Sequence, residues 1–490
     1  MKGIKIFIAI VLFVLPIVGR GMWFYRGLPQ PRDVDVPDYG ALTVPKPPIS
    51  NAEAEESASL PGRVVLVDYY HGNQFVISEI EALTAALSER GVRTEVDTGY
   101  LSLNTYLKYV SAYVIISPTV MFTIDEVKSV QRFVERGGRL LILTDPTRNM
   151  FYYDYYTYAT FIFSDVNSAN NLLSPFDIVI SDDHLYNLVN NEGNYRNVLF
   201  EEFNDLELTQ GLEQIAFYAT HSVHTDSGTD LFISDENTFS SQTDANGGFS
   251  AAALSADGNV LAVGDFTFFM PPYNQVADNA LFIDHIVDFL LEGTRVFDLT
   301  NFPYLFNAGI ASLLPTEEVI LNSDIFGPLA SLQSTLRNVN VDLTIVEEDP
   351  GEGDLIVLGL FSPTEDLTPY LEPFGLELKQ EEDDESKDTI LVPGFGELKR
   401  SGLGILLFRQ EGGRNILISL ADTADDLPML ISVLSYGDIS SCLVRENIAV
   451  CGVGFADKYY QEPWIEGIPE EPVEEEPPIE EMATPIPVVP

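Results

Sequence analysis

The sequence predicts an α/β protein in which parallel strands, buried on both faces, alternate with helices. Short apolar segments at 64–67, 113–116 and 140–143 are separated by stretches whose apolar residues recur at helical spacing. Each apolar segment stops at polar or turn-forming residues, as strands do when they leave a buried sheet. In sheets of this kind ligands bind at the carboxyl ends of the strands, so a functional site is expected there.

An apolar run at 6–19 follows two lysines at the N-terminus. Its length suits the core of a cleaved signal peptide, but aromatic residues at 23–25 continue the apolar character and favour a membrane interface. No small-residue cleavage site follows, and no nearby cysteine offers a lipid anchor. We therefore expect 1–26 to be an uncleaved signal anchor. This predicts a single-pass protein of the cell membrane with the bulk of the chain extracytoplasmic.

Two segments of biased composition enclose the folded part of the chain. Residues 27–62 are rich in Pro, Ser, Ala and Glu without an apolar period, which indicates a linker. Residues 461–490 are acidic and Pro/Glu-rich, and we interpret them as a disordered tail. Between them we place a first α/β domain at 63–295 and a shortened second copy at 296–460.

The first domain opens with the strand 64–67. The buried face of the helix that follows would carry Ile77, Ile80, Leu83 and Leu87. After the strand 113–116, Thr123 and Glu126 form a T-x-x-E capping box that begins a second helix. That helix is expected to end at Gly137, and the strand 140–143 comes next.

The later part of this domain carries a tyrosine-rich insert at 151–158, which we expect to be a half-buried flap over the crevice. A helix is predicted at 167–173, and two apolar strands turn at 257–258. A last helix at 278–291 would bury Leu281, Ile286 and Phe289.

Parts of this plan recur after residue 296. An apolar stretch at 319–321 would be the first strand, and Ser362-Pro363-Thr364 repeats the tripeptide at 117–119. Apolar strands at 404–408 and 416–420 would pair and end at Asp422, as the first copy ends at Asp265. Pro373-Phe374-Gly375-Leu376 repeats Pro175-Phe176-Asp177-Ile178, and far fewer residues lie between the tripeptide and this Pro-Phe pair in the second copy. They leave no room for the capped helix and the strand that ends at Asp145. The second copy is therefore predicted to be truncated.

Charge and cysteine content limit the compartment and the partners. With 26 basic and 75 acidic residues the formal net charge is −49, which argues against nucleic acid as a partner. Cys442 and Cys451 flank a predicted tight hairpin that turns at 446–447, so their sulfurs would lie opposite each other. A disulfide there would persist only in an oxidising compartment, and two buried thiols are the alternative.

The first copy resembles the DUF4350 family and the related GldG-like domains associated with ABC transporters, which share a fold with class I glutamine amidotransferases. The residues that carry the resemblance over 63–293 are Asp68, His71-Gly72, Ser117-Pro118, Phe122-Thr123, Gly137-Gly138-Arg139, Val263-Gly264-Asp265 and Asn279. The resemblance implies a flavodoxin-like, amidotransferase-like parallel sheet and work at a membrane complex. It implies no activity.

Glutaminase chemistry needs a thiolate on the sharp turn after the fourth strand. This chain has Thr144-Asp145-Pro146 there, and proline lacks the N–H that an oxyanion would need. A G-x-S-x-G elbow, a P-loop and a G-x-G-x-x-G motif are also absent from the sequence. His221, His224 and Asp226 have a spacing compatible with metal ligation, but we interpret them as structural or exposed residues.

The remaining candidates for ligand binding are the polar residues after the buried strands: Asp68, His71, Ser117, Thr119, Asp145, Arg148 and Asp265. We predict a non-catalytic binding or scaffold protein without a cofactor, accessory to an ABC transporter or envelope complex. The alternative is a metal-dependent hydrolase that uses the crevice carboxylates. Against it, strand-ending aspartates commonly cap the turns that follow them. A third possibility is a purely structural surface protein whose crevice is filled by 152–158.

Overall fold

The structure is a computed structural model that describes residues 2–25, 64–306, 309–316, 319, 323–361, 367–379, 389–436, 439 and 441–453. The chain divides into two units, 1–56 and 57–490. The first unit contains α1 (Lys2–Tyr25), within which Gly3–Met22 is apolar and long enough to cross a membrane. It is the one helix of this kind in the described ranges, and a signal sequence has the same properties. The predicted linker and tail lie outside the described residues.

The second unit contains a seven-stranded sheet in the order β13-β16-β17-β4-β3-β1-β2. Its parallel strands are β1 (Val64–Asp68), β2 (Arg93–Asp97), β3 (Ala112–Ile116), β4 (Arg139–Leu143) and β17 (Val260–Val263). Two antiparallel strands continue it beyond β17, namely β16 (Ala252–Leu254) and β13 (Thr229–Asp230). The predicted parallel strands are confirmed, and β4 lies inside the sheet between β3 and β17. The sequence does not predict β2, because this edge strand is only partly buried and has no apolar run.

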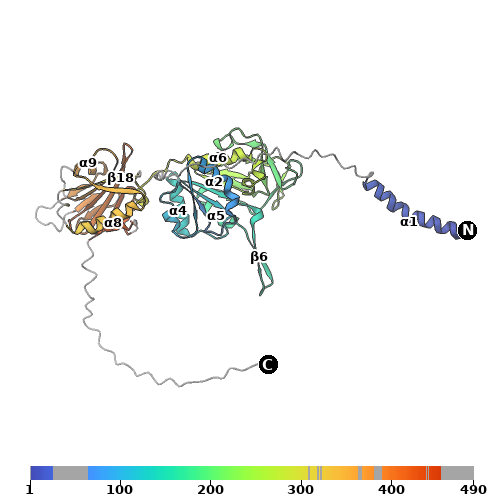
Figure 1. Cartoon of the computed structure of the whole chain (residues 1–490), viewed down its shortest axis with the longest axis horizontal. Helices are drawn as coiled ribbons and strands as arrows, with labels where there is room; N and C mark the ends of the chain where they lie inside the picture. The colour runs from blue at the N-terminus through green and yellow to red at the C-terminus, as the bar shows by residue number, and fades with distance from the viewer. Residues whose placement is uncertain are drawn as a thin grey trace, which may run out of the picture. The chain divides into compact units, whose positions relative to one another are not determined.

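Helices cover both faces of this sheet (Figure 1). One face is covered by η1 (Ile77–Ile80), α2 (Glu81–Glu89) and α6 (Asn279–Leu291). The other is covered by α3 (Leu103–Tyr106), α4 (Ile124–Glu135) and α5 (Val166–Leu173). The capping box is confirmed, because the Glu126 N–H donates to the Thr123 hydroxyl and the Thr123 N–H donates to the Glu126 carboxylate.

Two predicted core positions in these helices are wrong. Ile77 is 53% exposed because it lies in the opening 3₁₀ turn, before the α-helical period of α2 begins. Leu281 is 37% exposed because the buried stripe of α6 runs through its neighbours Phe282 and Ile283.

Between β4 and β16 the chain forms five short antiparallel strand pairs. They are β5 (Met150–Asp154) with β6 (Ala159–Phe163), β7 (Ile178–Ile180) with β12 (Val223–Thr225), β8 (Leu185–Asn187) with β15 (Thr238–Ser240), β9 (Asn197–Phe200) with β11 (Ile215–Tyr218), and β10 (Glu202–Phe203) with β14 (Phe232–Ile233). Short 3₁₀ helices connect several elements: η2 (Pro146–Arg148), η3 (Ser174–Phe176), η4 (Glu207–Thr209), η5 (Thr267–Phe269), η6 (Tyr273–Gln275) and η7 (Leu299–Asn301).

The tyrosine-rich segment is not the half-buried flap that the sequence predicts. It belongs to the β5–β6 hairpin, which extends away from the sheet and its helices (Figure 1). Tyr155, Tyr156 and Tyr158 near its turn are each at least 79% exposed. Aromatic content predicts burial only where another layer of the protein covers the rings, and within the described ranges these rings remain exposed.

A second seven-stranded sheet has the order β19-β18-β20-β25-β24-β27-β26. Its strands are β18 (Gly309–Pro315), β19 (Val341–Ile345), β20 (Asp354–Leu360), β24 (Leu403–Glu411), β25 (Arg414–Ala421), β26 (Leu443–Arg445) and β27 (Ile448–Gly452). The first three and β25 are parallel, and the rest are antiparallel. The associated helices are η8 (Ser323–Ile325), α8 (Phe326–Arg337), α9 (Thr368–Leu371), η9 (Glu372–Phe374) and α10 (Leu427–Ser435). A small sheet joins β21 (Glu377–Lys379), β22 (Thr389–Val392) and β23 (Gly396–Lys399).

The first strand described in this part is β18, whereas the predicted strand at 319–321 lies outside the described residues except for Val319. The apolar segment before Pro315 pairs with β19 and β20, whereas Val319 is a buried residue after the strand has ended. The tripeptide at 362–364 lies outside the described residues. Cys442 and Cys451 form a disulfide across the β26–β27 hairpin, with their Cα atoms 4.4 Å apart.

Candidate functional site

The structure places the predicted crevice residues after four neighbouring strands, in the spatial order β17, β4, β3 and β1. They form two groups. Asp68, His71, Ser117 and Thr119 lie on the loops after β1 and β3, and Asp145, Arg148 and Asp265 on the loops after β4 and β17.

Asp68 is the centre of the first group and is fully buried. The Nδ2 of Asn73 lies 2.7 Å from its Oδ2, and the Nδ1 of His71 lies 2.9 Å from the same oxygen. The backbone N–H of Tyr70 donates to the other oxygen. The carboxylate thus organises the turn that follows β1, which is the capping role of a strand-ending aspartate.

The imidazole of His71 is enclosed and charged groups surround it. Its ring stacks on Phe122 with centroids 3.9 Å apart, and its Nε2 lies 3.5 Å from a carboxylate oxygen of Glu126. Burial alone lowers the pKa of His71, but the hydrogen bond and charge of Asp68, together with Glu126, outweigh burial and raise it above its ordinary value. The two ring nitrogens of His71 thus face carboxylates from different loops, Asp68 and Glu126.

Ser117 and Thr119 connect the loop after β3 to the loop after β1. The backbone N–H of Thr119 donates to the carbonyl of His71, and its hydroxyl donates to the carbonyl of Gly72. The Ser117 carbonyl accepts from the N–H of Gln74, and Ser117 itself has a positive φ of 44°. These polar groups hold two loops together.

Asp145 is the centre of the second group and is also fully buried. One of its oxygens accepts from the N–H and hydroxyl of Thr147 in the turn that follows, at 2.8 and 2.6 Å. The other accepts from the Thr267 hydroxyl at 2.8 Å. Its own backbone N–H donates to Asp165. Both carboxylate oxygens and the N–H of this residue therefore have partners within the protein.

Asp265 follows the neighbouring strand β17 and is completely buried. Its oxygens accept from the backbone N–H groups of Tyr218 and Thr267, each at 2.7 Å. Burial, followed by the negative charge of Asp145, raises the pKa of Asp265 well above its ordinary value, although both hydrogen bonds act in the opposite direction.

Arg148 joins the two groups of crevice residues. Its guanidinium makes two hydrogen bonds to the Glu79 carboxylate and one to the carbonyl of Gln74, which lies in the loop after β1. Its Nε lies 3.6 Å from Asp145, and its guanidinium carbon lies 4.8 Å from the centre of the Phe266 ring. The cation thus compensates the carboxylates beneath it.

A cavity of about 590 Å³ lies beside Arg148. Of the predicted residues only Arg148 lines it, and the other lining residues are Glu79, Thr147, Asn194, Arg196, Asn197, Tyr218, Ala219, Thr267, Met270 and Tyr273. The rings of Tyr218 and Tyr273 lie 4.4 Å apart, and burial raises the pKa of Tyr218. Arg196 is exposed. Arg196 directly precedes β9, Tyr218 ends β11 and Tyr273 comes from η6, and no motif marks these residues in the sequence.

The geometry of the aspartates is that of caps. Asp68, Asp145 and Asp265 each accept a backbone N–H from the residue two positions later. In the part of the chain that the structure describes, no group of three or more His, Cys, Asp or Glu side chains is arranged to hold a metal ion. His221 is buried with its Nε2 3.5 Å from Asp165, and His224 is exposed between Asp226 and Asp230, so these two histidines do not converge on one site.

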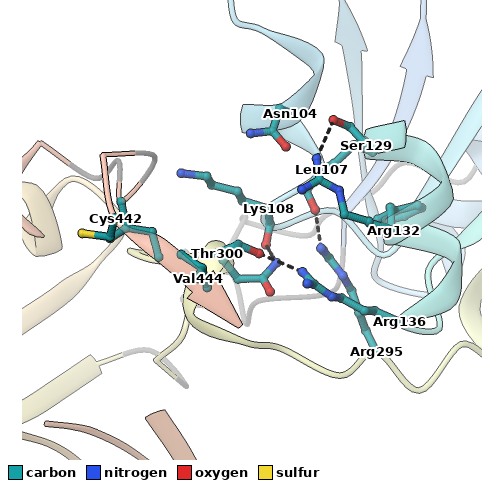
Figure 2. Close-up of a pocket in the computed structure, with 13 residues that line it drawn as sticks. Asn104, Leu107, Lys108, Ser129, Arg132, Arg136, Arg295, Thr300, Cys442 and Val444 are labelled. Carbon is teal, nitrogen blue, oxygen red and sulfur yellow. Dashed lines mark hydrogen bonds between the residues drawn. The ribbon is translucent and has the colours of Figure 1, made fainter. Parts of the chain in front are cut away.

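A second cavity, of about 320 Å³, is unusually basic for so acidic a chain (Figure 2). Lys108, Arg132, Arg136 and Arg295 line it, and the sequence does not mark them. Arg136 pairs with Asp298 and donates to the Thr300 hydroxyl at 2.7 Å. Arg295 donates to the carbonyls of Leu107 and Val110, and burial lowers its pKa to about 9. These arginines hold the segment around 295–301 against the first sheet domain.

No protein-family model matches the sequence, and no curated protein matches it. Solved structures similar to parts of the chain include the following three. The mmIFT52 N-terminal domain is 15% identical with a TM-score of 0.37, over 48% of this chain and 100% of that one. The exo-β-1,4-mannosidase Op5Man5 from Opitutaceae bacterium strain TAV5 is 14% identical with a TM-score of 0.26, over 50% and 38%. A ThuA-like protein from Parabacteroides merdae is 10% identical with a TM-score of 0.28, over 49% and 94%. Likenesses of this size assign neither a family nor an activity to the chain.

Proposed function

We propose that this protein is a membrane-anchored, extracytoplasmic binding or scaffold protein with a non-catalytic amidotransferase-like domain, accessory to an ABC transporter or envelope complex. The observation that carries the proposal is the turn after β4. Asp145 stands there with both oxygens and its N–H taken by Thr147, Thr267 and Asp165. A residue so fully engaged is neither a free base nor an oxyanion donor.

The arrangement of the strands supports the resemblance to the DUF4350 and GldG-like domains. The parallel order β2-β1-β3-β4-β17 puts the loops after β1, β3 and β4 side by side at one edge of the sheet. In class I glutamine amidotransferases the resemblance would put a nucleophile after β4, where this chain has Asp145 followed by Pro146. In this proposal the sheet has the strand order of an amidotransferase, and the position of the nucleophile is occupied by Asp145, which caps the following turn.

A comparison of the two large sheets supports a truncated second copy. In the first sheet β4 lies between β3 and β17, whereas in the second β20 pairs directly with β25. Taking β18, β19, β20, β25 and β24 as the counterparts of β1, β2, β3, β17 and β16 makes the two orders agree except for the missing β4. The strand that would be missing is the one that ends at Asp145 in the first copy.

The extracytoplasmic placement is supported by two features of different kinds. The apolar helix α1 is long enough to span a membrane. The Cys442–Cys451 disulfide lies in the second sheet domain and belongs to an oxidising compartment. Together they suit a chain whose anchor is at the N-terminus and whose folded part lies outside the cytoplasm.

The cavity beside Arg148 is the surface that this function would use. The terminal nitrogens of Arg148 bond to Glu79 and Gln74, and its side chain is mostly buried, whereas Arg196 is an exposed cation in the lining of the cavity. The rings of Tyr218 and Tyr273, which lie against each other at an angle of 51°, offer an apolar surface nearby. An acidic group of a partner subunit or small molecule is the chemistry that this surface would accept.

The test compares the full chain with two charge reversals in the membranes of the producing cells. Arg196→Glu alters the cavity, and Arg337→Glu alters an exposed arginine on α8 of the second sheet domain, 63% exposed, as the matched control. After mild solubilisation we expect the wild type and Arg337→Glu to migrate in a larger complex in native electrophoresis, and Arg196→Glu to migrate alone.

Three results would count against the proposal. One is a chain that is released from membranes by alkaline carbonate, and another is a folded part that is protected from protease added outside intact spheroplasts. The third is release of ammonia from glutamine by the purified chain, which would show that the fold has kept its chemistry.

A further inference from the structure

The β5–β6 hairpin is an exposed apolar projection. Eight of its fourteen residues at 150–163 are Phe or Tyr, whereas aromatic residues make up 11% of the whole chain. Every apolar side chain of the pair from Met150 to Phe163 that is larger than alanine is more than 40% exposed, and Tyr156 at the turn is 95% exposed. In Figure 1 the hairpin, labelled β6, stands clear of the sheet and helices of its domain. An isolated two-stranded hairpin is only marginally stable in water, and exposed apolar surface of this kind usually marks a binding site for a protein or a membrane.

The pairing register shows that both faces of the hairpin are apolar. Side chains of directly opposed residues lie on the same face, and the faces alternate along each strand. Tyr152 opposite Phe161 therefore lies on one face, and Phe151 opposite Ile162 lies on the other. A flat protein surface, including a second copy of this hairpin, would cover one face and leave the other in water. Immersion in an apolar medium covers both faces and the tip together.

The hairpin is also almost free of charge. Asp154 is its one charged residue, in a chain with a formal net charge of −49. The carboxylate of Asp154 accepts from the Tyr156 N–H and the Thr157 hydroxyl, both at 2.8 Å, so it closes the turn. Strong acidity elsewhere in the chain would repel an anionic surface, and the hairpin with its single carboxylate adds little to that repulsion. The surface that fits the hairpin is therefore that of a bilayer whose lipids are zwitterionic and carry no net charge.

We propose that the β5–β6 hairpin inserts into the interfacial layer of the lipid bilayer, as a second membrane contact besides α1. Tyrosine rings favour this layer because their apolar body enters the acyl boundary while the hydroxyl stays hydrated. Asp154 limits the depth, since a carboxylate does not enter the hydrocarbon core at low cost. The inference rests on the proposed membrane anchoring. The chain between Tyr25 and Val64 is 38 residues long and spans at most roughly 130 Å, so the tether limits how far the domain can move from the bilayer.

The test uses the full chain with one added thiol. Both native cysteines are joined in the disulfide, so Tyr156→Cys creates a unique site for a nitroxide label. The matched control is Tyr436→Cys, at a tyrosine that is 85% exposed after α10 in the second sheet domain. Each labelled chain is reconstituted into phosphatidylcholine vesicles, and collision of the nitroxide with oxygen and with a water-soluble nickel chelate is measured. At 156 we expect oxygen collision to rise and nickel collision to fall severalfold relative to the same chain in detergent, with neither change at 436.

The possible failures are distinct. If the vesicles retain the chain but the label at 156 is as open to the nickel chelate as the label at 436, the hairpin proposal is wrong and the anchor stands. If the label at 156 is shielded in detergent as well, and more so at higher protein concentration, a protein contact covers the hairpin and the proposal is again wrong. A chain that does not stay with the vesicles contradicts the anchor, and the hairpin proposal falls with it.

Discussion

The guanidinium of Arg148 makes two hydrogen bonds, of 2.8 and 3.0 Å, to the carboxylate of Glu79. Glu79 opens the helix after β1, and Arg148 follows β4, two strands away in the sheet. The pair therefore joins the loops that form the edge of the crevice. It also places a cation next to Asp145, whose carboxylate is fully buried.

Replacing this cation should be costly for the fold. In Arg148→Met the buried Asp145 loses its nearest positive charge and Glu79 loses its partner. Breaking a buried pair in this way costs about 3–5 kcal/mol, and we expect a destabilisation of that order for the first sheet domain. Pulse proteolysis in urea, which follows cleavage of the unfolded fraction, measures it.

Glu79→Gln is the matched control for this change. It keeps Arg148 in contact with Asp145 and Gln74 and removes the charge, but not the shape, of the side chain that accepts two hydrogen bonds from Arg148, so we expect a loss of about 1 kcal/mol. Equal effects of the two substitutions would show that Asp145 does not depend on Arg148.

His71 should titrate above its ordinary pKa in the folded protein, because Asp68 and Glu126 oppose the effect of burial. A raised folded pKa means that this contribution to stability is complete below the unfolded value of about 6.5 and is lost as the pH rises through the folded value. In Asp68→Asn burial remains while the nearest charge is gone, so the pKa of His71 should fall. NMR titration of ¹⁵N-labelled histidine rings gives the pKa directly.

The same spectra provide an internal control, the pKa of His184. Burial and the charge of Arg196 lower the pKa of His184, so its ring should titrate below that of His71 in the wild type and stay unchanged in Asp68→Asn. A His71 ring that titrates below its ordinary value in the wild type would contradict the role given to Asp68.

Gly264, just after β17 and next to Asp265, lets the backbone of His221 pack closely against it. A Cβ at this position would lie 2.2 Å from the carbonyl oxygen of His221, a backbone atom that cannot move aside cheaply. Gly264→Ala should destabilise the first sheet domain by about 1–3 kcal/mol. Thermal unfolding measures the loss of stability, and hydrogen exchange of peptides that contain β17 shows whether the loss is in this part of the sheet.

Gly327→Ala is the same chemical change in a different setting. Gly327 lies in α8, and a Cβ there meets no atom within 4 Å. Because alanine has less backbone entropy to lose, this substitution should be neutral or stabilising by up to about 1 kcal/mol. Destabilisation of similar size in both variants would show that lost glycine flexibility, and not the contact with His221, is the cause.

The Cys442–Cys451 disulfide closes a loop with a sequence separation of 9, and both residues are packed in the core of the second sheet domain. In the loop-closure account a bridge of this length stabilises by roughly 2–3 kcal/mol. The double variant Cys442→Ser with Cys451→Ser should lower the stability of the second domain by that amount and leave the first unchanged. Domain-resolved hydrogen exchange separates the two, and a matching loss in β1 or β4 would contradict the assignment.

Much of the frame was accessible from local signals. Runs such as 64–67 and 140–143 are apolar at every position because strands buried on both faces need it, and the Thr123–Glu126 capping box marks a helix start by itself. Edge strand β2 carries no such run, so pattern alone does not reveal it. Apolar runs do occur in β7 and β11, but the pattern does not show which strand each of them pairs with. Strand β18 was missed in favour of 319–321, because both stretches are apolar and only pairing distinguishes them.

The sequence by itself determined the alternation of strands and helices, the acidic character and the aspartates that end the strands, because these depend on residues close together in the chain. Only the tertiary structure decided what those aspartates do. Asp145 accepts a hydrogen bond from Thr267, which is 122 residues away in the chain, and Asp265 accepts one from Tyr218, 47 residues away. Arg148 donates to Glu79 across a separation of 69 residues. The exposure of the tyrosine-rich segment was likewise decided by packing, because the burial of a side chain depends on which residues surround it in space.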